Sequence, residues 1–548
     1  MTFLNDNVAT QKNTFYVKDF DSSKKLVDAV SPTFCAAKWL QVSLHLTNGK
    51  THSCYHPPTH SIDVSELIDN PAALHNTTQK FQERKLMLSG QRPSGCDYCW
   101  KIEDAGHVSD RYYRSSEHWA KHKIIEISQQ PFDFNVVPTY VEVNFNQTCN
   151  FKCAYCSPHL SSEWENEIKK FGAYKINGQE HNDIVTLKNI GLMPIEESNK
   201  NNPYVQAFWR WWPVIYKDLE VFRMTGGEPL LDANTFKILD YVYQHPNKKL
   251  ELGVTSNMCP PRQDIFDKFL EKVKLLDSVE YNVECYVPDP KDGSEWQTWP
   301  HFVIDAKEKA YHNNPLPSIE RVNIPQTFLE IGHALEDNSF TYLYNYKDQA
   351  CKHFILYVSL DSVGNHAEYL RNGLDFKTLK TNVRRFLKET VNTSVSFINT
   401  FNLLSIPKFK DYLKFVLELR KEFCKETQSV EKPFQRIWFD IPLLRSPKWL
   451  SVFNASAEQI AELKVTHQWM KLHTDISMYN KTFTGFKPFE LDKLERNIQM
   501  IADNKYIATD ITQNHQDLKQ FFTEHDSRRQ TNFELTFPEL AEWYRNIT

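Results

Sequence analysis

Three cysteines lie within one short segment, in the order Cys149-Asn-Phe-Lys-Cys153-Ala-Tyr-Cys156. Thiolates are soft ligands that suit iron–sulfur clusters, and three of them on one loop can each bind one iron of a cubane. The fourth iron would then have no protein ligand and would be open to a substrate. Electron-transfer ferredoxins use the spacing C-x2-C-x2-C with a fourth cysteine, so this C-x3-C-x2-C spacing favours inner-sphere chemistry. A zinc knuckle is the alternative interpretation.

Four more cysteines precede this loop and form a second candidate metal site. They are Cys35, Cys54, Cys96 and Cys99. Thirteen residues separate the first from Gly49, and four more separate Gly49 from the second. A helix is expected over residues 79–89, so the C-x2-C pair would lie on the loop that follows it. Four thiolates suit either a fully ligated cubane or tetrahedral zinc, and the spacing leaves both open.

Composition limits the class of protein. The chain has 548 residues, 41% of them hydrophobic, which predicts two to four domains with sizeable cores. The net charge of -5 argues against a nucleic-acid partner. No apolar run approaches the roughly 20 residues that span a bilayer, and residues 1–20 lack the layout of a signal peptide. We therefore expect a cytoplasmic protein with no membrane partner, whose clustered cysteines are metal ligands rather than disulfides.

Short β-type runs alternate with helical stretches from residue 139 onward. The expected strands are 139–145, 219–224, 250–255, 355–360, 393–398 and 437–441. The expected helices are 234–243, 264–276, 378–390 and 408–423. This alternation predicts an α/β fold with βα units around a parallel sheet, and six units fit an incomplete barrel better than a closed eight-fold one.

Two spacers within this region exceed ordinary loop lengths and are expected to be structured inserts, at about 161–216 and 278–352. The aromatic run Phe208-Trp209-Arg210-Trp211-Trp212 is predicted to form the core of the first insert, with a substrate platform as the alternative. The expected domains are a cysteine-rich module over 1–130, the barrel over 131–454 and a helical C-terminal extension over 455–548.

Together these motifs resemble the radical S-adenosylmethionine (SAM) superfamily. The run Gly226-Gly227-Glu228-Pro229 follows the second expected strand and looks like that family's GGEP motif. Tyr155 stands before the last cysteine of the loop, where that family usually has an aromatic residue. The resemblance covers roughly residues 139–450 and implies a partial (β/α)6 barrel with its site at the C-terminal strand ends. It also implies that Cys149, Cys153 and Cys156 hold a [4Fe–4S] cluster whose open iron binds SAM.

The same resemblance implies which residues surround SAM. Glu228 would contact the methionine ammonium, and Arg371 would pair with the SAM carboxylate. The alternative for Arg371 is a surface residue at the start of a helix. The full set implied to bind the cofactor is Tyr155, Gly226, Gly227, Glu228, Pro229, Ser256, Asn257, Ser359, Asp361 and Arg371.

The N-terminal cysteines are similar to a twitch or SPASM auxiliary-cluster domain, because they show a C-x13-G-x4-C hairpin and a later C-x2-C. The stretch from Trp100 to Gly106 looks like the N-terminal twitch version. This implies a second, auxiliary [4Fe–4S] cluster beside the substrate cavity. The usual domain follows the barrel, whereas this one precedes it, and Ala105 stands where a SPASM domain has its next cysteine. The ligands therefore suffice for one auxiliary cluster, with zinc as the alternative metal.

The resemblance implies an enzyme that cleaves SAM reductively and abstracts hydrogen from its substrate through a 5′-deoxyadenosyl radical. An external electron donor such as flavodoxin or ferredoxin would reduce the cluster. Related enzymes imply a peptide or protein substrate, with a small molecule or sugar as the alternative, although no winged helix for a leader peptide is evident. A non-catalytic iron–sulfur or zinc scaffold is the remaining hypothesis, but it would be expected to lack motif residues that this chain retains.

Overall fold

The computed structural model describes residues 13–195, 201–287, 333–334, 340–423, 436–474, 484–503 and 510–547. Most of the predicted insert at 278–352 therefore lies outside the described residues. In the part that is described, no helix is both long and apolar enough to cross a membrane.

A nine-stranded sheet forms the centre of the molecule, and its strand order is β16-β15-β13-β9-β8-β4-β1-β2-β3. All six strands predicted from the sequence are present: β4 (Tyr140–Asn144), β8 (Val221–Thr225), β9 (Asn247–Ser256), β13 (Cys351–Ser359), β15 (Thr393–Ile398) and β16 (Ile437–Asp440). They are parallel and lie side by side in chain order. The predicted α/β class with a parallel sheet is confirmed.

The four predicted helices are also present, as α12 (Ala233–Gln244), α13 (Gln263–Asp277), α15 (Phe376–Glu389) and α16 (Phe409–Phe423). They cover the apolar face of the sheet. Phe354 of β13, for example, lies with its ring centroid 6.2 Å from those of Phe269 in α13 and Phe386 in α15. Side chains alternate between the two faces of a strand, so the opposite face is a separate surface. That inner face is polar, with Glu142, Arg223 and Tyr357 on adjacent parts of it.

The sheet continues into the N-terminal module. Strand β1 (Gln41–His45) pairs in parallel with β4, and β2 (Lys50–His52) and β3 (His60–Ser61) follow as antiparallel strands. Val42 and Leu44 of β1 are buried in the same core as the strands of the barrel. The module and the barrel thus share one sheet. The domain boundary expected between residues 130 and 131 stays a prediction.

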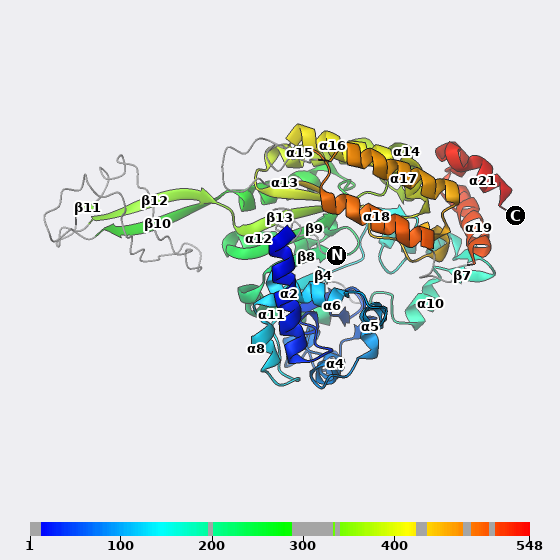
Figure 1. The fold of residues 1–548 in the computed structure, drawn as a ribbon. Helices are drawn as coiled ribbons and strands as arrows, with labels where there is room; N and C mark the ends of the chain where they lie inside the picture. Colours follow the sequence, from blue (N-terminus) through cyan, green and yellow to red (C-terminus); the bar gives the residue numbers. More distant parts are fainter. Residues whose placement is uncertain are drawn as a thin grey trace.

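The first insert is structured. It contains α9 (Ser162–Phe171), the hairpin β6 (Tyr174–Ile176) and β7 (Gln179–His181), α10 (Ile184–Asn189) and α11 (Pro203–Asp218). Phe208, Trp211 and Trp212 are buried, which confirms the prediction that the aromatic run is core. Of the second insert, β10 (Val279–Val287) and β12 (Phe340–Asp348) form an antiparallel hairpin that projects from the body of the molecule (Figure 1).

The C-terminal part is helical, with α17 (Ala457–Leu472), α18 (Pro488–Asp503), α19 (Ile511–Arg529), α20 (Phe533–Thr536) and α21 (Ala541–Asn546). These helices lie on the opposite side of the molecule from the N-terminal module (Figure 1). Helix α19 packs on the first insert, because Phe521 stacks on Tyr174 with ring centroids 4.7 Å apart. This contact brings the end of α19 near the loop that carries the three cysteines.

Candidate active site

The three-cysteine loop follows β4 and is held by its backbone. The short strand β5 (Lys152–Cys153) pairs with β14 (Arg371–Asn372). The hydroxyl of Ser162 accepts a hydrogen bond from the Cys149 amide and donates one to its carbonyl, both at 3.1 Å. The indole of Trp164 donates to the Cys153 carbonyl at 2.8 Å. These contacts fix the loop through peptide groups and leave the thiols available to a metal.

The GGEP turn lies directly against the entrance to this loop. The Glu228 amide donates to the Thr148 carbonyl at 2.7 Å. A Cβ atom added to Gly227 would lie 2.4 Å from the same carbonyl oxygen, and one added to Gly226 would lie 2.3 Å from the Asn144 side chain. Gly226 also has a φ of +121°, which disfavours other residues. Both glycines are therefore required for the turn after β8 to contact the cysteine loop.

Glu228 ties this turn to the end of β9. Its buried carboxylate accepts hydrogen bonds from the amides of Leu230 at 3.1 Å and Asn257 at 2.7 Å. Burial raises the pKa of Glu228 to about 7. The Asn257 side chain donates in turn to Asn150 of the cysteine loop at 2.9 Å. The cysteine loop, the GGEP turn and the end of β9 therefore form one connected edge.

The next strand along contributes a buried acid to the same edge. Asp361, which follows β13, is fully buried and accepts hydrogen bonds from the Tyr155 hydroxyl at 2.7 Å and the Thr400 amide at 2.8 Å. Ser359 ends β13 and is partly exposed, whereas Ser256 is buried at the end of β9. The structure thus brings all the residues implied for SAM to the edge where the parallel strands end.

Arg371 is at the centre of this edge. Its Nε and Nη2 lie 2.8 and 3.1 Å from the Asp361 carboxylate, and its Nη1 donates to the Cys153 sulfur at 3.6 Å. Only 6% of Arg371 is exposed, so the alternative of a surface residue is wrong. A contact with the SAM carboxylate stays a prediction, because Nη1 and Nη2 already donate hydrogen bonds within the protein and Nε lies in the ion pair with Asp361.

The chemistry of the loop suits a cationic cluster. Burial raises the pKa of Cys156 to about 12, and it also raises the pKa values of Cys149 and Cys153 above their usual range. Buried thiolates are costly without a cation, and metal binding requires deprotonated thiols and supplies that charge. The three thiols therefore fit a [4Fe–4S] cluster with one open iron.

The four N-terminal cysteines also come together. Cys35, Cys54, Cys96 and Cys99 line one pocket, together with Lys38 and Arg111. Burial raises the pKa of Cys35 to about 12 and that of Cys96 to about 11. The described residues include no group of three or more histidine, cysteine or acidic side chains arranged to hold a metal ion. Four thiols have the chemistry that an auxiliary cluster or zinc requires, but whether a metal binds here, and which one, stays a prediction.

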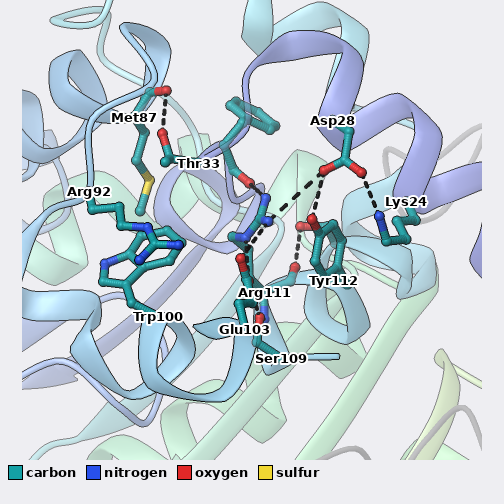
Figure 2. Close-up of polar contacts among 12 residues, drawn as sticks. Lys24, Asp28, Thr33, Met87, Arg92, Trp100, Glu103, Ser109, Arg111 and Tyr112 are labelled. Carbon is teal, nitrogen blue, oxygen red and sulfur yellow. Dashed lines mark hydrogen bonds and ion pairs between the residues drawn. The ribbon is translucent and has the colours of Figure 1, made fainter. Parts of the chain in front are cut away.

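Arg111 organises the wall of this pocket (Figure 2). Its Nε and Nη2 donate to the Glu103 carboxylate at 2.9 and 3.0 Å, and its Nη1 donates to the Phe34 carbonyl at 2.8 Å. Glu103 belongs to the stretch that resembles a twitch domain. The contacts join the segment just before Cys35 to α5 (Asp97–Asp104), which carries Cys99.

The two cysteine sites lie at opposite ends of the parallel strands. Cys35 precedes β1, which is parallel to β4, whereas the three-cysteine loop follows β4. Strand β2 runs back antiparallel to β1, so Cys54 returns to the end where the parallel strands begin. Five residues of β4 at about 3.3 Å each give a separation of at least ~17 Å along the strand.

A polar network on the inner face lies between these ends, and the sequence reasoning missed it. The Tyr55 hydroxyl contacts the Tyr140 hydroxyl at 2.6 Å and donates to Glu142 at 3.0 Å. Arg223 donates to Tyr55 at 3.1 Å and lies over the Tyr357 ring at 4.1 Å. Polar residues alternate with apolar ones along β4 and β8, and side chains at every second position of a strand share one face. This pattern could have predicted the polar network.

Comparisons with known proteins give distant relatives. The chain is 22% identical over 292 residues to a GTP 3′,8-cyclase of Trichodesmium erythraeum (strain IMS101), which covers 52% of this chain and 75% of that protein. It is 24% identical over 162 residues to the GTP 3′,8-cyclase of Trichormus variabilis (strain ATCC 29413 / PCC 7937), covering 29% of this chain and 40% of that one. No protein-family model matches the chain.

The comparison with solved structures gave two weak matches. They are native anSMEcpe with bound AdoMet and Cp18Cys peptide, with a TM-score of 0.28, and native anSMEcpe with bound AdoMet, with a TM-score of 0.30. Each is 12% identical and covers 74% of this chain, and 99% and 100% of the respective solved chains. These TM-scores are below the level at which two chains share a fold, so the fold is defined by the sheet described above.

Sequence similarity to the Trichodesmium cyclase extends over 292 residues, far beyond a single motif. Within the structure, the cysteine loop and the GGEP turn touch at the carboxyl edge of a parallel α/β sheet, where barrel enzymes place their chemistry. The sequence similarity, the cysteine loop and the GGEP turn together support the radical SAM superfamily and an enzymatic activity for this chain.

Proposed function

We propose that this enzyme cleaves SAM reductively and modifies its substrate by hydrogen abstraction. The observation that carries the proposal is the contact between the GGEP turn and the cysteine loop, with the Glu228 amide 2.7 Å from the Thr148 carbonyl. Cys149, Cys153 and Cys156 would hold a [4Fe–4S] cluster. When bound, the cluster supplies the electron that releases methionine and a 5′-deoxyadenosyl radical from SAM.

Residues at the same edge would bind and orient SAM. Glu228 accepts two backbone hydrogen bonds and retains lone pairs for the methionine ammonium. Ser359, which is partly exposed, would make a polar contact with the nucleoside. Tyr155, Asp361 and Arg371 form a buried network beneath them, which would keep the site rigid.

For the substrate we propose a peptide or protein segment held on the polar inner face. Among the described residues, buried side-chain atoms of Gln41, Ser43 and Ser396 have no hydrogen-bond partner, although all three lie on this face. A buried polar group without a partner costs about 1–3 kcal/mol. Peptide groups carry both donors and acceptors and would suit a face this polar.

The N-terminal cysteines would hold an auxiliary [4Fe–4S] cluster at the far end of the same face. The substrate would then lie between the two clusters. An external donor such as flavodoxin or ferredoxin, in the cytoplasm, would reduce the enzyme.

A small-molecule substrate is the second candidate. It is favoured by the relatives, because the Trichodesmium protein named as a GTP 3′,8-cyclase is matched over 75% of its length. A nucleotide would also offer donors and acceptors to the inner face.

The proposal is tested with anaerobic, dithionite-reduced protein. We expect chromatography to show 5′-deoxyadenosine and methionine formed from SAM, and the Cys153→Ala variant to form none. No nucleoside product above that control would refute catalysis. The substrate class is tested by adding GTP or separate peptide, protein and small-molecule fractions of a cell extract. The fraction that stimulates 5′-deoxyadenosine formation identifies the class, and stimulation by GTP alone would overturn the peptide proposal.

A further inference from the structure

The last turn of α19 contacts the cysteine loop, although it lies far along the chain. The Arg529 side chain is buried, with 1% of it exposed. Its Nη1 donates to the Lys152 carbonyl at 2.7 Å, and Lys152 directly precedes Cys153. Its Nε and Nη2 each lie 3.0 Å from the Glu167 carboxylate in α9. A buried arginine from the C-terminal helix thus holds the peptide group next to a cluster ligand.

Glu167 keeps Arg529 in place. Burial alone would raise the pKa of Glu167, but the hydrogen bonds and charge of Arg529 lower this pKa to about 2. The Lys152 ammonium lies 2.7 Å from the same carboxylate. The guanidinium also lies over the Trp164 ring at 4.8 Å, and Trp164 donates to the Cys153 carbonyl. Every group around Arg529 is therefore linked to the backbone at Cys153.

The same turn of α19 also contacts the helix that precedes the strand paired with the cysteine loop. Asp526 accepts a hydrogen bond from the Tyr369 hydroxyl at 2.7 Å. Tyr369 lies near the end of α14 (Gly364–Leu370), immediately before β14. Because β14 pairs with β5, one helical turn contacts β5 and the end of the helix that leads into β14.

Two buried cations therefore contact Cys153 or the residue before it. Arg371 donates to its sulfur from β14 at 3.6 Å, while Arg529 holds the preceding peptide group from α19. Arg371 is paired with Asp361 and Arg529 with Glu167, so removing either arginine would leave an uncompensated carboxylate in the surroundings of this thiol. Both arginines therefore favour negative charge at this sulfur.

Positive charge near a bound cluster affects how readily the cluster is reduced. Reduction adds one electron, and its negative charge is stabilised by nearby cations and by hydrogen bonds to the sulfurs. Such interactions are stronger in a buried site than in water. Removing either cation should make the reduced state less favourable.

We propose that Arg371 and Arg529 are positioning residues that fix Cys153 and raise the reduction potential of the cluster, which makes α19 part of the cluster site. This inference rests on the proposed function, because it requires a cluster on the three-cysteine loop.

The test compares Arg529→Gln and Arg371→Gln with a matched control, Arg528→Gln, in the reconstituted full-length protein. Arg528 is the neighbouring residue in the same turn, but it donates to the carbonyls of Gly172 and Ala173 rather than to the cysteine loop. Redox titration followed by electron paramagnetic resonance gives the midpoint potential of the signal that changes when SAM is added. We expect at least a tenfold loss in the reduction equilibrium for both test variants, a shift of ~59 mV to more negative potential for one electron. The control should match the wild type.

The outcomes separate this inference from the proposed function. Unchanged midpoint potentials in both test variants, with full iron content, would overturn the inference and leave SAM cleavage intact. A wild type that binds no iron would instead refute the proposed function. If Arg529→Gln loses iron while Arg528→Gln retains it, and Arg529→Lys restores it, the positioning role is supported. Equal iron loss in the Arg529 and Arg528 variants would overturn it.

Discussion

Replacement of Glu228 by glutamine should change stability in opposite ways at low and high pH. Two effects compete at this buried position. The carboxylate accepts hydrogen bonds from two backbone amides, and an amide side chain would leave one of them facing an NH2 group. Loss of one such buried hydrogen bond costs about 1–3 kcal/mol.

The second effect is the cost of ionising Glu228. Burial raises its pKa from the usual 4.5 to about 7 in the folded protein. The folded state therefore holds its proton more tightly than the unfolded state, so wild-type stability falls as pH rises from about 4.5 to 7. This shift in pKa corresponds to an ionisation cost of about 3 kcal/mol in the stability of the folded protein. The cost is absent below pH 4.5 and complete above pH 7. Glutamine does not ionise and avoids this cost.

Urea unfolding of the metal-free wild type and Glu228→Gln at pH 4.5 and pH 8 tests both effects. At the lower pH the variant should be less stable by about 1–3 kcal/mol, because only the hydrogen bond differs. At the higher pH the variant should equal or exceed the wild type, since the wild type then carries the ionisation cost. The same stability difference at both pH values would refute the reasoning.

In the holoenzyme, the variant should bind SAM roughly 10- to 150-fold more weakly by calorimetry if Glu228 meets the methionine ammonium, since a hydrogen bond between charged groups contributes about 1.5–3 kcal/mol.

Three further predictions concern the clusters and the inner face. Reconstituted wild type should hold about eight irons per chain; alanine at Cys149, Cys153 and Cys156 should leave about four and abolish SAM cleavage. Alanine at Cys96 and Cys99 should also leave about four irons but retain substrate-free SAM cleavage, and zinc in the first variant would refute the auxiliary cluster. Gly227→Ala should lower iron retention, because its Cβ would lie 2.4 Å from a backbone oxygen of the cysteine loop. Gly178→Ala in the turn between β6 and β7 should retain iron, because its Cβ would meet nothing within 4 Å and its φ of +72° strains only that turn. Tyr55→Phe should slow substrate turnover without changing substrate-free SAM cleavage; equal loss of both would contradict a substrate role for the inner face.

Local sequence patterns determined the parts of this protein that depend on neighbouring residues. The spacing of Cys149, Cys153 and Cys156 allows three thiols on one loop to share a cluster. The glycines of the GGEP turn indicate a close approach of backbones. The six barrel strands could be predicted because each is a short apolar run bounded by helical sequence, and all six are present.

Only the tertiary structure decided which of these segments meet. Strand β1 joins β4 through backbone hydrogen bonds, which carry no information about the partner in the sequence. That pairing places the two cysteine sites at opposite ends of the strands. Arg371 pairs with Asp361 and Cys153, and Arg529 reaches the cysteine loop from the other end of the chain. Such contacts depend on how distant elements pack, because a side chain's partners are set by burial and geometry, whereas the sequence alone determines only which groups are available to pair.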